Sequence, residues 1–181
     1  FVKPMAVLFL ITLLLMLEPD FGATVVTVGT AFGMLFLAGV KLGQFVLVIL
    51  SSAMALVLLI VTSPYRLQRW LAFSDPWADE FKFGSGYQLT QSLIAFGRGE
   101  WSGVGLGNSI QKLFFLPESH TDFVFAIYAE EFGAVGSLIL IGLFVVLIMQ
   151  IMRLGRQAEQ MLKPFHAYVA YGIALMMSSQ V

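Results

Sequence analysis

The sequence predicts an all-α fold, a polytopic bundle of transmembrane helices with one large ordered loop outside the membrane. Of the 181 residues, 59% are hydrophobic and only 12% are charged, and the mean hydropathy is +0.88. Soluble domains average about 45–50% apolar and about 25% charged residues. The apolar residues also gather in uncharged runs, several of which approach the roughly 20 residues that a helix needs to cross a bilayer. Only a helix satisfies its own backbone in such a run.

Five apolar runs predict five spans. The second and third are uncharged and of full length. Glu130 and Glu131 interrupt the fourth, so residues 123–131 form either a helical lead-in or the outer part of one long, tilted helix. Because the chain begins and ends in apolar sequence, we expect it to be the middle of a longer protein. The predicted spans, all in one membrane domain over 1–181, are 1–17, 21–40, 42–63, 123–152 and 164–181.

Small residues inside the spans predict close packing between helices, because they let two backbones approach. Gly29, Gly33 and Gly39 are the examples in the second run. We expect them to pack helices rather than to contact a ligand.

The positions of lysine and arginine predict the orientation. Connections rich in these residues stay on the cytoplasmic side. Along this chain, every second connection between spans is rich in them. The predicted cytoplasmic positive charges are those of Lys3, Lys41 and the loop 153–163, with Arg153, Arg156 and Lys163. The segment Glu18-Pro19-Asp20 and the long loop 64–122 then lie outside.

The loop 64–122 is far longer than a turn, and loops of more than about 12–15 residues are usually functional or disordered. Its many aromatic residues, Trp70, Trp77 and Trp101 among them, favour an ordered layer at the membrane surface. Residues 87–96 place Leu89, Leu93 and Phe96 at helical spacing, which predicts an amphipathic surface helix. The glycine-rich stretch 97–107 that follows is either a phosphate-accommodating loop beside Arg98 or a tightly turned connection.

The end of the outer loop crowds three titratable groups, Glu118, His120 and Asp122, just before an apolar helix. Asp122 has two readings. It either stabilises the helix N-terminus as a carboxylate or acts as a general base at the membrane edge. The spacing supplies no third metal ligand, and Glu118 with Asp122 would bind a hard cation only if the fold added more oxygens.

Acids and cations together at the outer rim suit an amphiphilic substrate with an anionic head. Cations would hold phosphates while a carboxylate removes a proton. A lipid-linked sugar and a transported lipid both fit this description. Glu130 and Glu131 either face an aqueous cavity or mark the interface. The candidate groups besides the end of the loop are Glu18, Asp20, Arg66, Arg98 and Lys112.

The balance of charge excludes some classes. Ten Lys and Arg against eleven Asp and Glu leave no basic excess for the phosphates of a nucleic acid. Without cysteine the chain has neither disulfides nor thiolate metal sites.

Several segments together resemble the SEDS family of membrane proteins, and its cell-division branch more than its elongation branch. These are EPDFG at 18–22, SDPW at 74–77, GYQLTQSLIAFGRGE at 86–100, GLGNSIQKL at 105–113 and LPESHTDFVFAIYAEEFGAVG at 116–136. The resemblance implies a SEDS-type bundle of about ten spans, of which this chain would hold about five. It also implies a multi-pass protein of the bacterial cytoplasmic membrane, at the division septum.

The activity that the resemblance implies is inverting glycosyl transfer, in which lipid II is polymerised on the outer face into β-1,4-linked peptidoglycan and undecaprenyl diphosphate is released. Partners would be a cognate class B penicillin-binding protein and other divisome membrane proteins. A transporter of lipid II or a non-catalytic divisome scaffold is the alternative.

The same resemblance assigns roles to residues. Asp122 matches the family's essential acid and would be the catalytic base, with Glu118 and His120 orienting it or holding the acceptor sugar. Positive charge at the leaving diphosphate would come from Arg66, Arg98, Lys112 or a divalent cation such as Mg²⁺ or Mn²⁺. Glu18 and Asp20 would contact substrate or brace the first hairpin.

Overall fold

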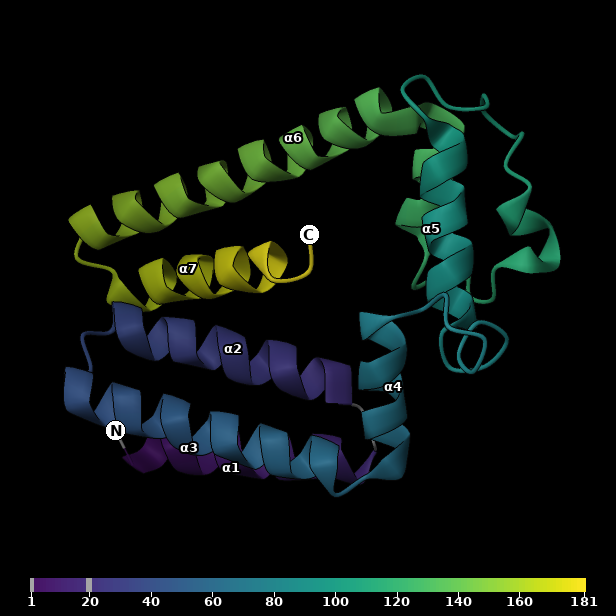
Figure 1. The fold of residues 1–181 in the computed structure, drawn as a ribbon. Coiled ribbons are helices and arrows are strands. Elements are labelled where there is room, and N and C mark those ends of the chain that lie inside the picture. Colours follow the sequence, from purple (N-terminus) through teal and green to yellow (C-terminus); the bar gives the residue numbers. More distant parts are fainter. Residues whose placement is uncertain (1, 19–20) are drawn as a thin grey trace. The chain divides into compact units, whose positions relative to one another are not determined.

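The computed structural model describes residues 2–18 and 21–181, and every regular element in these ranges is helical (Figure 1). The predicted all-α fold is confirmed. In chain order the elements are α1 (Val2–Leu17), α2 (Phe21–Leu37), α3 (Leu42–Val61), α4 (Pro64–Ser74), α5 (Tyr87–Gly99), the π-helical turn η1 (Gln111–Phe115), α6 (Val124–Gln160) and α7 (Pro164–Ser178).

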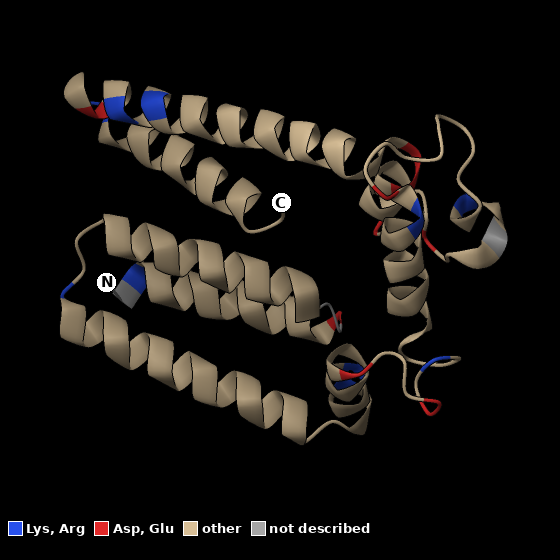
Figure 2. Ribbon diagram, turned by 45° about the horizontal axis from the view of Figure 1, so that its top comes forward, with Lys and Arg blue, Asp and Glu red and all other residues tan. Residues whose placement is uncertain are grey.

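Two helices of the described chain, α3 and α6, are long and apolar enough to cross a membrane. Shorter apolar helices cover Lys3–Leu17 and Phe21–Leu37. The rest of the chain buries 0% of the most apolar 18-residue stretch of α3 and 6% of that of α6. Because large exposed apolar surfaces are rare on soluble monomers, these faces are suited to lipid or to further helices. Figure 2 shows α2 and α3 almost free of charged residues.

One compact unit comprises Phe1–Ala53 and Leu143–Val181. In it α2 packs against α1 and α7, and glycine permits the approach: a Cβ at Gly33 would lie 2.8 Å from Leu175 Cδ1. The packing role predicted for Gly33 is therefore confirmed. Gly29 has no atom within 4 Å of that position, and Gly39 has a positive φ of 71° after the end of α2. These two glycines do not pack helices together among the described residues.

The second unit, Met54–Gly142, holds the outer loop. Its core consists of Ala95, Leu116 and Ala126, with Phe123 and Ile127 packed against them. The helix predicted over 87–96 is present as α5, which lies beside the first turns of α6 (Figure 1). Its buried face carries Thr90, Ser92, Ala95 and Gly99, while Leu93 and Phe96 are exposed, as an amphipathic surface helix requires.

The fourth apolar run is broken rather than continuous. Gly133 interrupts α6 with φ 68° and ψ −168°, a conformation that glycine adopts without steric cost. Of the two readings of residues 123–131, the structure therefore has the helical lead-in. Beyond the break the helix continues to Gln160, so most of the predicted inner loop 153–163 is helical.

Candidate functional site

The segment 116–123 presents Asp122 on a tight turn. Leu116 is buried at one end and Phe123 packs on the same core at the other. Between them the carbonyl oxygen of Glu118 accepts hydrogen bonds from the amides of Thr121 and Phe123, each at 3.2 Å. Glu118 adopts a positive φ of 53° to close the turn. The two ends of the segment are therefore held in the core, while Thr121 and Asp122 are exposed.

Asp122 is exposed, and its carboxylate has no hydrogen bond or ion pair within residues 2–18 and 21–181. It precedes Val124, the first residue of α6, and caps none of its amides. A capping hydrogen bond is thus absent among the described residues, and stabilisation of the N-terminus of α6 through the helix dipole stays a prediction. A carboxylate that is exposed and unpartnered on an ordered turn is available to an external proton donor.

Among residues 2–18 and 21–181, no hydrogen bond joins Glu118 or His120 to Asp122, and their role toward Asp122 or the acceptor sugar stays a prediction. The Glu118 carboxylate accepts a hydrogen bond from the Thr121 hydroxyl at 2.8 Å, and His120 is exposed. Over the described ranges no three His, Asp or Glu groups converge in a way that would hold a metal. Glu118 and Asp122 alone do not form a divalent-cation site, so the Mg²⁺ or Mn²⁺ assignment remains a prediction.

Glu130 is the most deeply buried acid of the second unit, with a side chain that is 0% exposed. Its Oε2 accepts hydrogen bonds from the Ser109 hydroxyl at 2.5 Å and the Gln111 amide at 3.2 Å. Its Oε1 accepts the Ile110 amide at 3.2 Å and lies 3.6 Å from Arg98 Nε. The carboxylate is therefore surrounded by donors, as a buried charge requires.

Glu131 makes the complementary contacts. Its Oε1 lies 2.5 Å from Lys112 Nζ and 3.4 Å from the Ser109 amide. The prediction of an aqueous cavity is wrong, because both acids are buried against residues 109–112. The prediction that they mark the interface stays a prediction. The available signal was one of charge: two acids in an apolar helix need two cations, and the outer loop carries Arg98 and Lys112.

These pairs change what the predicted phosphate contacts can do. Lys112 is engaged by Glu131, and Arg98, whose side chain is 40% exposed, sits beside Glu130. Arg66 donates from Nη1 to the carbonyl of Leu59 at 3.0 Å, near the end of α3. Of the three cations, Arg98 has the most exposed side chain, and the role of all three toward a diphosphate stays a prediction.

The glycine-rich stretch 97–107 closes over the break in α6. In an unbroken helix Ala134 and Val135 would donate to the carbonyls of Glu130 and Glu131. Here the loop takes up all four groups, since a backbone polar group left unpaired in the interior is costly. The hydrogen bonds are Val104 to Glu130 (3.0 Å), Gly105 to Glu131 (3.1 Å), Ala134 to Glu100 (2.8 Å) and Val135 to Trp101 (3.2 Å), amide to carbonyl in each case.

This backbone exchange explains the glycines. A Cβ at Gly99 would lie 2.1 Å from the Ala129 carbonyl oxygen, and one at Gly103 would lie 2.1 Å from that of Glu131. Of the two predictions for residues 97–107, the structure shows the tightly turned connection. The amides of Val104 and Gly105 are already bonded to α6 and do not form a phosphate cradle.

The sequence also predicts two acidic site residues at the first hairpin, Glu18 and Asp20. Glu18 is exposed and belongs to the first unit. Asp20 lies outside the described residues. Their assignment to substrate or to the hairpin therefore remains a prediction.

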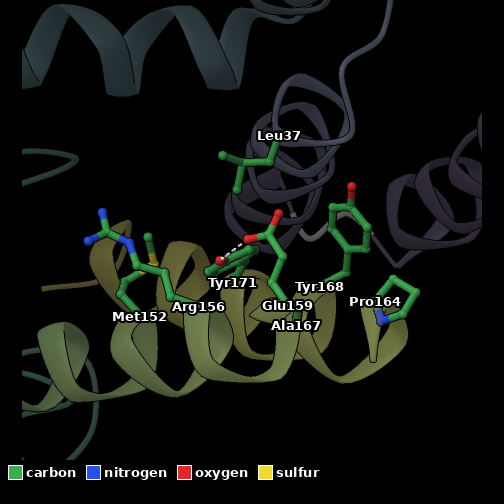
Figure 3. A pocket seen from close by; sticks show the side chains of 8 residues that line it. All are labelled: Leu37, Met152, Arg156, Glu159, Pro164, Ala167, Tyr168 and Tyr171. Carbon is green, nitrogen blue, oxygen red and sulfur yellow. Dashed lines mark hydrogen bonds between the residues drawn. The ribbon is translucent and has the colours of Figure 1, made fainter. Parts of the chain in front are cut away.

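A cavity of about 250 Å³ lies in the first unit and contains none of the predicted site residues. Figure 3 shows Glu159 at its centre, accepting a hydrogen bond from the Tyr171 hydroxyl at 2.9 Å. The ring of Tyr171 rests on Gly155, where a Cβ would lie 2.4 Å away. The lining residues are Leu37, Met152, Arg156, Glu159, Pro164, Ala167, Tyr168 and Tyr171. This hydrogen bond and close contact mark it as a gap in the packing of α6 and α7.

Comparison with known proteins identifies the family. A family model described as a cell cycle protein, FTSW_RODA_SPOVE, matches residues 1–181. A relative from Hahella chejuensis, named a probable peptidoglycan glycosyltransferase FtsW, is 57% identical over 99% of this chain and 45% of its own length. Relatives with the same name from Coxiella burnetii (57% identical, 100% of this chain, 48% of theirs) and Pseudomonas fluorescens (54%, 99% and 44%) agree.

The chain spans less than half the length of these curated relatives. The match nevertheless runs through every described element, from α1 to α7. It agrees with the family expected from the sequence motifs. The chain belongs to the FTSW_RODA_SPOVE family of cell cycle proteins.

Proposed function

We propose that this chain is the central part of a peptidoglycan glycosyltransferase that polymerises lipid II during septal cell-wall synthesis. The observation that carries the proposal is Asp122, an exposed and unpartnered carboxylate on a turn with buried ends. The names of relatives more than 50% identical over nearly the whole chain support the reaction class. The apolar helices support a place in the cytoplasmic membrane, with the loop 64–122 outside.

In the proposed reaction Asp122 is the general base. It accepts the proton of the 4-hydroxyl of the acceptor N-acetylglucosamine as that oxygen attacks the anomeric carbon of the donor N-acetylmuramic acid. The new O–C bond forms as the bond from that carbon to the diphosphate breaks, and undecaprenyl diphosphate leaves with the electron pair. Inversion at the carbon gives the β-1,4 link. General bases of this kind contribute about 10²–10⁴-fold to a rate.

The diphosphate is a good leaving group and needs positive charge more than a proton. Arg98 suits this task best, because its guanidinium is partly exposed and already oriented by Glu130. Lys112, which is paired with Glu131, would add positive charge near the diphosphate. Arg66, held at the end of α3, would do the same. In the full protein a class B penicillin-binding protein and other divisome proteins would be partners at the septum.

The test is polymer formation from lipid II by the full-length protein, purified with its penicillin-binding partner. We expect Asp122→Asn to lower the polymerisation rate at least 100-fold, because the amide cannot accept the proton. Asp79→Asn is the matched control: it makes the same chemical change at another exposed acid of the outer loop and should leave the rate unchanged. A well-folded Asp122→Asn protein that retained most activity would rule out the base.

The same experiment separates the other functions. If neither the native protein nor the variant forms polymer while lipid II still moves between leaflets, the protein is a transporter. If division is supported by Asp122→Ala in cells, and neither activity is found, it is a scaffold.

A further inference from the structure

The position of Asp122 depends entirely on the segment that carries it, because its side chain has no partner within residues 2–18 and 21–181. That segment is held at two levels. The nearer level is apolar: Leu116 and Phe123 bracket the turn and join the core around Ala95 and Ala126. The second level is polar and lies earlier in the chain, at residues 109–111.

Glu130 forms most of this polar level with both of its oxygens, and Glu131 adds a hydrogen bond from the Ser109 amide at 3.4 Å. The Ser109 hydroxyl and Gln111 amide donate to Oε2, the Ile110 amide donates to Oε1, and Arg98 lies beside Oε1. Hydrogen bonds to a charged acceptor are worth about twice those between neutral groups. The side chain is 0% exposed, so no bulk water competes for these donors.

The resulting arrangement is a closed loop of chain. Glu130 follows Asp122 in the chain and lies on the lead-in of α6. It accepts hydrogen bonds from residues 109–111, which precede Asp122 and lead into η1. The Ile110 bond spans 20 residues and the Ser109 bond spans 21. Asp122 therefore lies on a loop whose two ends are joined mainly by the buried carboxylate of Glu130, with Glu131 beside it.

On the basis of the proposed function, we infer that Glu130 is a positioning residue for the reaction. It does not touch substrate. It fixes the position of the turn that carries Asp122, and its carboxylate also orients Arg98. Displacement of a catalytic group by about 1 Å costs on the order of 100-fold in rate.

Glu130→Gln is the sharpest variant because it keeps the shape of the side chain. Its amide group would replace one oxygen and would face an amide or hydroxyl donor, so at least one of the three hydrogen bonds is lost. We expect kcat for polymerisation to fall about 10–100-fold while KM for lipid II stays within about twofold. The matched control is Glu159→Gln, the same change on the same helix, at an exposed acid that bonds Tyr171. Its kinetics should equal those of the native protein.

A second readout does not depend on activity. Hydrogen exchange of the native full-length protein should show the amides of Ile110 and Gln111 protected, because Glu130 accepts both. In Glu130→Gln these two amides should exchange faster, whereas the amides of α6 beyond Gly133 should keep their protection.

Each outcome decides the inference. A kcat as high as that of Glu159→Gln, or a KM that rises in step with the loss of rate, would overturn it. If Glu130→Gln does not fold, Ser109→Ala decides by the same criteria, with an expected loss in kcat of about 3–10-fold. A native protein that forms no polymer would overturn the proposed function itself, and the exchange of Ile110 and Gln111 would still report whether Glu130 fastens the loop.

Discussion

The helices α2 and α7 and the lead-in of α6 bring backbones close together by different means. At α2 and α7 the contact is between glycine and side chain, as at Gly33 and Leu175, and the buried groups named there include no acid. At the lead-in the contact is between backbone and backbone, and two acids are buried. Side-chain contacts yield to small shifts, whereas paired backbone and buried charge do not.

The largest effect on stability is expected where backbone meets backbone. Gly103→Ala should lower the free energy of unfolding by about 3 kcal/mol, since a Cβ there is strained at φ 77° and collides with the Glu131 carbonyl. The measurement is thermal unfolding of the full-length protein in detergent.

Gly107→Ala is the control for Gly103→Ala, because Gly107 has φ 84° but open space around its Cβ position. It should cost about 1 kcal/mol from backbone strain alone. Equal losses at the two positions would contradict the role of the close approach.

A smaller effect is expected at the ion pair. Lys112→Met leaves Glu131 largely buried without its cation and should cost about 2 kcal/mol. Adding Glu131→Gln should restore about half of this loss, because the unpaired charge is then gone. Unfolding of the two single variants and the double variant, compared as a cycle, measures the coupling. Additive losses would show that the pair contributes nothing.

The smallest effect is expected between α2 and α7. Gly33→Ala meets only the end of the Leu175 side chain, which can rotate away, so the cost should be about 1 kcal/mol. Gly29→Ala, in open space on the same helix, should be neutral or stabilising by up to about 1 kcal/mol. The same unfolding measurement distinguishes them. A larger loss at Gly33 than at Gly103 would reverse the comparison between the two regions.

The sequence was sufficient for features that depend on neighbouring residues. Runs of apolar residues located α1, α2, α3, α6 and α7, since periodicity and length act locally, but they did not locate α4 inside the predicted outer loop. Asp122 was selected as a candidate from its place before an apolar helix and from the motif around it, and its role stays a prediction. The spacing of Leu89, Leu93 and Phe96 likewise predicted α5.

The features that sequence reasoning missed depend on contacts between distant segments. The hydrogen-bond donors to Glu130 and Glu131 lie about twenty residues earlier in the chain, with Arg98 further back. Nothing in the local pattern selects residues 109–112 over other donors. The break at Gly133 was equally hidden, because a glycine inside an apolar run is compatible with a continuous helix. Only the loop that closes over it determines the outcome.

That closure has a consequence for the order in which the chain is made. Residues 100–105, which take up the backbone groups freed at Gly133, are synthesised before the helix that needs them. Proteins are made from the N-terminus, so the partners already exist when the lead-in of α6 emerges. The partners of the four backbone groups at the bend are therefore made before α6 itself, so these groups need not stay unpaired while the rest of α6 is synthesised.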